Sequence, residues 1–152
     1  MNHFKTPESY LPHEAPMCLL EQVVAVSEQG AHCRVTVTPD GVLAPFLTPD
    51  GALPGWFAIE LMAQTVGVWN GWYDPDNQRI GMLLGGRELC CEPGRFSPGM
   101  VLDCHVQMLM RDDKVGSFEG RICCQGIQLA SGRINTWQPD DEQLQQLIGE
   151  KG

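Results

Sequence analysis

The stretch LPGWFAIELMAQTVGVWNGW, residues 53–72, is the segment from which we predict the fold. It is apolar nearly all round, Pro54 and Gly55 suit a helix entrance, and the turn residues DPDN at 74–77 follow it. A long helix without a polar face is a buried helix. We therefore predict one buried helix over residues 54–73.

Glu60 lies in the middle of this stretch, between Ile59 and Leu61. An ionised carboxylate is costly to bury unless it is paired or hydrogen-bonded. Gln64 follows one helical turn later on the same face, where it can hydrogen-bond to Glu60. Two interpretations are open: Glu60 is a satisfied buried group, tied to a backbone amide or an arginine, or it is kept for chemistry. Gln64 in turn is either part of such a site or a core amide.

The segments on both sides of the helix alternate as strands do, and the turn residues divide them into pairs. We predict strands over residues 18–26, 31–39, 79–92, 100–112, 117–125 and 127–137, a long irregular loop over 39–55 and a short terminal helix over 139–150. One long buried helix with one antiparallel sheet requires the sheet to wrap around the helix. The expected structure is an α+β hotdog fold, formed by residues 1–152 as a single domain.

The formal net charge is −9 at pH 7, and no basic stripe is present, so nucleic acid is disfavoured as a partner. No uncharged apolar run reaches the roughly 18 residues that a membrane-spanning helix needs. Residues 1–17 lack the charged and apolar regions of a signal peptide. We expect a cytoplasmic protein with no membrane partner.

Seven cysteines are present, and none is spaced as Cys-x-x-Cys, which argues against a zinc or redox site. Free cysteines are commonly small buried residues, and the cytosol keeps them reduced. We expect them in the core of the strands. No metal ion and no cofactor is expected.

Three segments carry a family resemblance: YLPHEAPMCLLEQVV at 10–24, LPGWFAIELMAQTVG at 53–67, and the long stretch at 83–113 with its Pro-Gly turns. They resemble the (3R)-hydroxyacyl-acyl-carrier-protein dehydratases. Nearly the whole chain is similar to a divergent branch of that family, the dehydratases of aryl polyene pigment clusters. The resemblance implies dehydration of a 3-hydroxyacyl thioester, carried on acyl carrier protein, to the trans-2-enoyl form.

The resemblance makes Glu60 the acid that protonates the departing hydroxyl. The amides of Gly55 and Trp56 lie at the helix N-terminus, where free N–H groups and the helix dipole favour a developing oxyanion on the thioester. Gly55, Trp56 and Gln64 are the expected substrate-binding residues, and Gln64 can also hydrogen-bond to Glu60. The apolar helix face would line a tunnel for the acyl chain.

The family has a histidine fourteen residues before the acidic residue, and this chain has Phe46 there. His13 is one candidate for the missing base, although it also suits packing of the N-terminal segment. In the family, the histidine of one subunit pairs with the carboxylate of the other. A protomer with Glu60 and no histidine therefore suggests half a site, completed in a heterodimer with a histidine-bearing hotdog subunit; a homo-oligomer is the alternative.

Two other functions stay open: a hotdog thioesterase that uses the helix carboxylate, and a non-catalytic acyl-binding or scaffold subunit. An acidic carrier protein needs a basic docking patch, and the best cluster in sequence is Arg79, Arg87 and Arg95. A partner subunit could approach the small residues Ala63, Gly67 and Gly71 of the helix, or the exposed edge of a strand.

Overall fold

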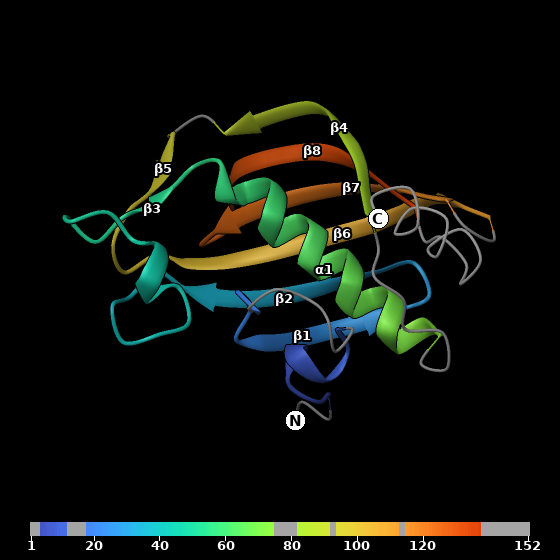
Figure 1. Cartoon of the computed structure of the whole chain (residues 1–152), viewed down its shortest axis with the longest axis horizontal. Helices are drawn as coiled ribbons and strands as arrows, with labels where there is room; N and C mark the ends of the chain where they lie inside the picture. Colours follow the sequence, from blue (N-terminus) through green and yellow to red (C-terminus); the bar gives the residue numbers. More distant parts are fainter. Residues whose placement is uncertain (1–3, 12–17, 75–81, 92–93, 113–114, 138–152) are drawn as a thin grey trace, which may run out of the picture.

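One helix lies against one face of a curved sheet (Figure 1). The computed structural model describes residues 4–11, 18–74, 82–91, 94–112 and 115–137. The helix is α1 (Phe57–Tyr73), and the antiparallel six-stranded sheet has the order β1-β2-β6-β7-β8-β4. Its strands are β1 (Gln22–Ser27), β2 (Gly30–Thr36), β4 (Met82–Cys91), β6 (Val101–Arg111), β7 (Val115–Cys124) and β8 (Ile127–Trp137). The predicted hotdog fold is confirmed.

Four short elements of the described part lie outside the main sheet. They are the 3-10 turns η1 (Pro7–Ser9) and η2 (Ala44–Phe46), and the strands β3 (Leu53–Pro54) and β5 (Arg95–Phe96), which pair with each other. Pro54, predicted to open the helix, therefore belongs to a strand. The helix begins three residues later because pairing with β5 holds residues 53 and 54 extended.

The first strand also begins later than predicted, at Gln22 instead of residue 18. Residues 18–20 run beside α1 instead, where the backbone N–H of Leu19 donates to the side-chain oxygen of Gln64. The turn predicted at Gln125–Gly126 is confirmed, since both residues have positive φ (51° and 81°) and join β7 to β8.

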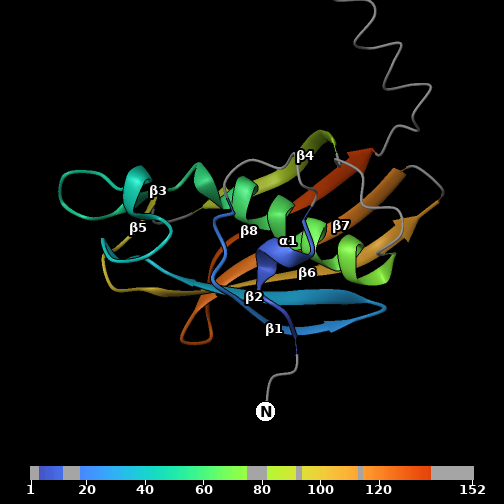
Figure 2. The same cartoon turned by 60° about the horizontal axis from the view of Figure 1, so that its bottom comes forward.

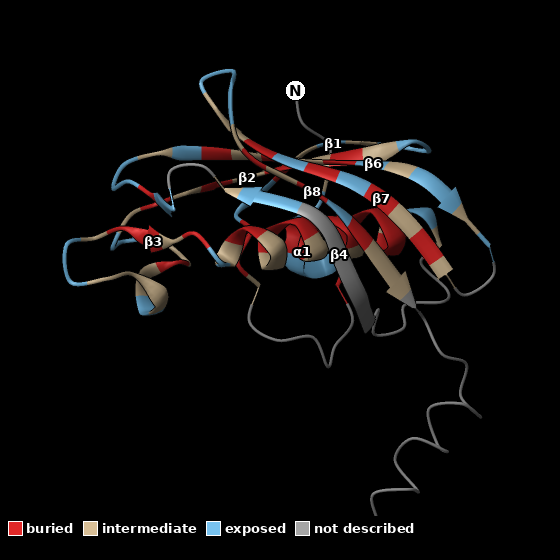
Figure 3. Cartoon of the chain, turned by 90° about the horizontal axis from the view of Figure 1, so that it is seen from above, coloured by how far each residue is buried: buried red, intermediate tan, exposed pale blue. Residues whose placement is uncertain are grey.

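The core lies between the helix and the concave face of the sheet (Figure 3). Cys33 and Val35 of β2, and Leu102 and Cys104 of β6, are fully buried, as their alternation predicts. The remaining cysteines correct the expectation of a common core location. Cys18, Cys91, Cys123 and Cys124 are half-buried and Cys90 is exposed; all are free thiols.

The small residues of the helix allow a close approach, as predicted, but the chain's own N-terminal segment makes it. A Cβ added at Gly71 would lie 1.8 Å from the Tyr10 carbonyl oxygen, and one at Gly67 would lie 2.7 Å from Cδ2 of Leu11. Figure 2 shows η1 lying beside α1. The Gly67–Gly71 face is therefore occupied, and among the described strands β1 and β4 form the edges of the main sheet, where a partner strand would pair.

Some predictions fall on residues 75–81 and 138–152, which lie outside the described residues, as does His13. They include the terminal helix and the position of Arg79. Among the described helices, none has the length and apolar character to cross a membrane.

Candidate active site

Gln64 links Glu60 to the main chain of the N-terminal segment. The Gln64 Nε2 group donates to Oε1 of Glu60 at 3.1 Å, and the Oε1 atom of Gln64 accepts the N–H of Leu19 at 2.7 Å. Gln64 is buried, and Glu60 is half-buried. The predicted contact between neighbouring helical turns is confirmed, and it fixes one oxygen of the carboxyl group while the group stays within reach of solvent.

Phe46 occupies the start of the same helix face. Its ring centroid lies 5.3 Å from that of Phe57, the first residue of α1, and Phe57 lies one turn before Glu60. The contact belongs to the rim of the hydrophobic core. An aromatic ring without a titratable nitrogen therefore stands where the dehydratase resemblance expects histidine.

The described residues on either side of His13 both contact this helix face. Leu11 packs at Gly67, and Leu19 bonds to Gln64. Glu60 thus lies on a helix face covered by the N-terminal segment at one end and by Phe46 at the other.

The helix N-terminus differs from the expectation in one respect. The N–H of Gly55 donates to the carbonyl of Gly94 at 3.0 Å, and the carbonyl of Gly55 accepts the N–H of Ala58 at 3.0 Å. The Gly55 amide is therefore engaged and not free to meet an oxyanion. Trp56 is the N-cap residue, and its side chain is 74% exposed.

An apolar pocket of about 370 Å³ opens between the first half of α1 and strand β4. The helix contributes Trp56, Ile59 and Met62, and the strand contributes the consecutive residues 89–91; the lining is completed by Gly55, Ala58, Gly94 and Ser131. Glu60 is not among the lining residues: it follows Ile59 along the chain, but successive helical side chains do not share a face, and Glu60 contacts Gln64 instead. The size and lining of the pocket suit a small apolar chain.

Comparison with known proteins adds to this geometry. The model of the ApeP-like family, described as ApeP dehydratase, matches residues 5–149. Over 127 residues the chain is 31% identical to the 3-hydroxyacyl-[acyl-carrier-protein] dehydratase FabZ of Magnetococcus marinus, which covers 78% of this chain and 79% of that protein. The chain belongs to the ApeP-like dehydratase family.

Solved structures agree with this ApeP-like assignment. A chain of the dehydratase heterocomplex ApeI:P from Xenorhabdus doucetiae superposes with a TM-score of 0.89 at 53% identity, covering 96% of this chain and 99% of that chain. The conserved protein PA5202 from Pseudomonas aeruginosa superposes with a TM-score of 0.60 at 17% identity, covering 77% of this chain and 86% of that chain. The second likeness concerns the fold alone.

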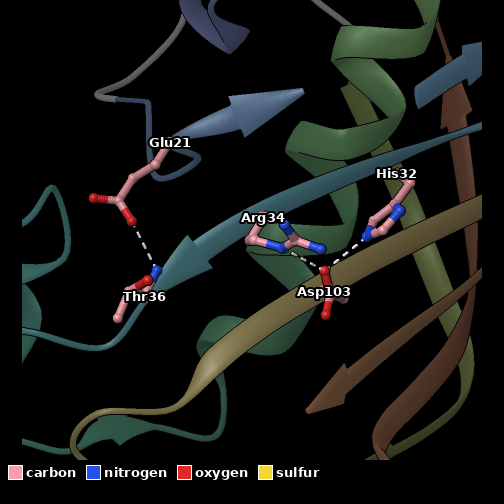
Figure 4. Close-up of polar contacts among 5 residues, drawn as sticks. All are labelled: Glu21, His32, Arg34, Thr36 and Asp103. Carbon is pink, nitrogen blue, oxygen red and sulfur yellow. Dashed lines mark hydrogen bonds and ion pairs between the residues drawn. The ribbon is translucent and has the colours of Figure 1, made fainter. Parts of the chain in front are cut away.

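The ApeP-like chain also carries a polar cluster that sequence reasoning missed (Figure 4). On the convex face of the sheet, Asp103 Oδ1 lies 2.7 Å from Nε2 of His32 and accepts Nε–H of Arg34 at 2.8 Å. His105 stacks on His32 with ring centroids 4.0 Å apart. The alternation of β2 and β6 predicts that these side chains share a face, but only their register, with His32 opposite His105, brings them together.

The surroundings of this cluster shift two pKa values. Burial lowers the pKa of His105 to about 4, and the neighbouring His32 acts in the same direction. Burial opposes ionisation of Asp103, but the hydrogen bonds from His32 and Arg34 outweigh it and lower its pKa. The cluster lies on the face of the sheet opposite α1, so it is separate from Glu60.

Of the docking cluster predicted for this ApeP-like dehydratase, the structure describes the side chain of Arg95, so the cluster stays a prediction. The Arg95 guanidinium forms an ion pair with the Asp50 carboxylate at 2.7 Å, so its charge is already compensated. Arg87 lies in β4, and its side chain is outside the described part.

Proposed function

We propose that this chain dehydrates 3-hydroxyacyl thioesters of acyl carrier protein to the trans-2-enoyl form, as the carboxylate-bearing half of a two-subunit site. Membership of a dehydratase family supports the reaction. One observation supports the division into halves: Glu60 and Gln64 are in place on the helix, while Phe46 fills the position of the expected histidine.

The reaction needs one proton removed and one delivered. A base takes the proton from carbon 2, the electron pair of that C–H bond forms the double bond, and the C–O bond at carbon 3 breaks. The Glu60 carboxyl group protonates the departing oxygen, which leaves as water. Transfer of a proton from the base to the Glu60 carboxylate then restores both groups for the next turnover. Gln64 holds the carboxyl group by donating to Oε1.

The thioester carbonyl gains negative charge as carbon 2 loses its proton, and a donor at that oxygen stabilises it. The Trp56 amide, at the N-terminal end of α1, is the proposed donor. The Gly55 amide, also proposed from the sequence, is the less suitable donor, because its N–H would first have to break its hydrogen bond to the Gly94 carbonyl.

We propose that the base comes from a histidine-bearing hotdog partner. The similar Xenorhabdus doucetiae protein is part of a dehydratase heterocomplex, which supports a two-subunit assembly. Strand β4 is the proposed docking edge, because it is a long edge strand and Leu89 on it is 47% exposed beside the exposed Trp56. A partner strand added there would also cover the mouth of the pocket. His13 is the alternative base.

The test measures enoyl-thioester formation by the purified protein alone, by the candidate partner alone and by their mixture. We expect turnover in the mixture at least about a hundredfold above either subunit, the usual worth of a positioned acid or base. Full turnover by this protein alone would contradict the divided site and point to a homo-oligomer with His13 as the base. A free acid product would indicate a thioesterase, and no turnover in any mixture would indicate a non-catalytic acyl-binding subunit.

A further inference from the structure

Two glycines face each other on the concave side of the sheet, beneath the pocket. Gly120 of β7 is directly opposite Gly132 of β8. Neither has a positive φ, so the backbone conformation does not require glycine at either position. What the missing side chains provide at this site is space.

Two pocket-lining side chains occupy that space. A Cβ added at Gly120 would lie 2.5 Å from Sδ and 3.0 Å from Cγ of Met62. A Cβ added at Gly132 would lie 2.3 Å from Cδ2 of Leu89. Met62 and Leu89 both line the apolar pocket between α1 and β4. The glycine pair is therefore the floor of a trough, and the ends of these two side chains separate it from the pocket.

The Met62 side chain can change its conformation over the glycine pair. Its side chain is buried, with 1% of its surface exposed, and it is unbranched with three rotatable bonds. Rotation of its terminal atoms away from Gly120 joins the trough to the pocket without moving the backbone. Methionine in this position adapts to the length of what enters the pocket more readily than a branched side chain would.

We infer that Met62, lying over the Gly120–Gly132 pair, determines how long an acyl chain the pocket accepts. This inference rests on the proposed function, because it takes the pocket as the acyl site. The apolar lining favours an acyl chain over a polar ligand, and Trp56, the proposed donor to the thioester carbonyl, is one of the lining residues. An acyl thioester whose carbonyl lies near Trp56 would extend its distal carbons along the helix toward Met62.

The test uses equilibrium binding of saturated acyl-pantetheine thioesters of increasing chain length, followed by intrinsic tryptophan fluorescence, because binding does not require turnover. The measured quantity is the ratio of affinities for a long and a short chain, in the full-length protein alone and with its partner. Met62→Ala removes the atoms over Gly120, and the ratio should rise by about fourfold for each methylene that enters the space. Gly120→Ala pushes Met62 toward the pocket, and the ratio should fall.

Two further variants keep the test decisive. Met62→Val removes the sulfur and the terminal methyl and leaves a short β-branched apolar side chain, so it serves if Met62→Ala does not fold; a smaller rise is expected. Met108→Ala shortens a half-buried methionine outside the pocket. It packs against a separate group of buried residues that includes Trp69 and Phe118, so the variant should leave the ratio unchanged.

The outcomes separate this inference from the proposed function. A folded Met62→Ala or Met62→Val protein with the ratio of the unmodified protein would overturn the role of Met62, as would an equal change in Met108→Ala. If the unmodified protein binds no acyl-pantetheine thioester, alone or with its partner, the acyl site itself is wrong and both proposals fail. Binding with an unchanged ratio removes only the chain-length role.

Discussion

Glu60 owes its setting to one residue that is close in sequence, Gln64, and to one that is distant, Leu19. Gln64 is one helical turn away, so their contact follows from helix geometry. Leu19 is 45 residues before Gln64, and only the fold brings its N–H to the amide oxygen. The carboxyl group is therefore oriented by a side chain that is itself held by the main chain, the arrangement that an acid acting on a bound substrate needs.

Replacing Glu60 tests the acid directly. Glu60→Gln keeps the size and the hydrogen bond to Gln64 but removes the acid. We expect dehydration by the complex to fall by about a hundredfold or more, with the melting temperature little changed. The measurement is kcat together with thermal unfolding. The control is Glu119→Gln, an exposed carboxyl group on β7; turnover of Glu60→Gln equal to that control would contradict the acid role.

Restoring the histidine tests the divided site. In Phe46→His, an imidazole stands at the start of α1, where Phe46 contacts Phe57. We expect the variant alone to gain dehydration by about tenfold or more, part of the roughly hundredfold that a positioned base supplies. Phe46→Leu is the matched control, since it perturbs the same packing without adding a base. Equal activity in the two variants would show that the missing base is not the cause of low activity.

At the scale of elements, α1 is held by the segments that cross it. The N-terminal segment covers its Gly67–Gly71 face, and the far end is fixed by the Trp69 indole, whose Nε1–H donates to the Ser27 carbonyl at 2.9 Å. Arg111 of β6 lies over the rings of Trp69 and Tyr73, with its Cζ 5.6 and 5.0 Å from their centroids. A cation beside the last turn also complements the helix dipole.

The two helix glycines should respond differently to alanine. At Gly71 the added Cβ meets the backbone of Tyr10, which cannot yield without moving the segment, whereas at Gly67 it meets only the end of the Leu11 side chain. We expect Gly71→Ala to lower the free energy of unfolding by about 1–3 kcal/mol. Gly67→Ala should be close to neutral, because the helix propensity of alanine offsets a small shift of Leu11. Denaturant unfolding measures both, and equal losses would contradict this account of the packing.

Across the whole molecule, the sheet has a convex face with its own charge network, and among the described strands β1 and β4 form its edges. The network contributes to stability in a pH-dependent way. His105 has a pKa of about 4 in the folded protein against an ordinary 6.5, so below pH 6.5 the unfolded chain binds more protons. Stability is therefore lost as pH falls from about 6.5 to about 4. The lowered pKa of Asp103 acts in the same direction at more acidic pH.

Removing the imidazole should flatten this dependence. His105→Gln keeps a polar side chain beside His32 but does not titrate. We expect the unfolding free energy of the variant to change less between pH 7 and pH 4 than that of the unmodified protein. The measurement is denaturant unfolding across this range. An identical pH profile would show that the stacked pair does not govern acid sensitivity.

The proposed partner edge is also testable on the whole assembly. Leu89→Lys places a charge on the exposed edge strand β4, and we expect it to weaken the complex with the histidine-bearing subunit by about tenfold or more. The control is Ile127→Lys, which changes a more exposed residue, at 65%, next to the β7–β8 turn. Association is measured by calorimetry. Equal affinities of the two variants would place the partner elsewhere.

Local patterns along the chain were sufficient to predict the main helix, the strands of the sheet and one half of the site. Period and turn chemistry are local properties, so the buried helix, the alternating strands of the sheet and the Glu60–Gln64 contact could all be predicted. The family followed from the motifs around Pro54–Gly55 and the acidic residue.

The features that depend on contacts between distant residues could not be predicted in this way. Pairing of β3 with β5 shortened the helix and engaged the Gly55 amide. The N-terminal segment took the glycine face of α1, strand register joined His32 to His105, and the facing glycines placed a trough under Met62. Each of these rests on which backbone lies beside which, and a pattern read along one chain does not contain that information.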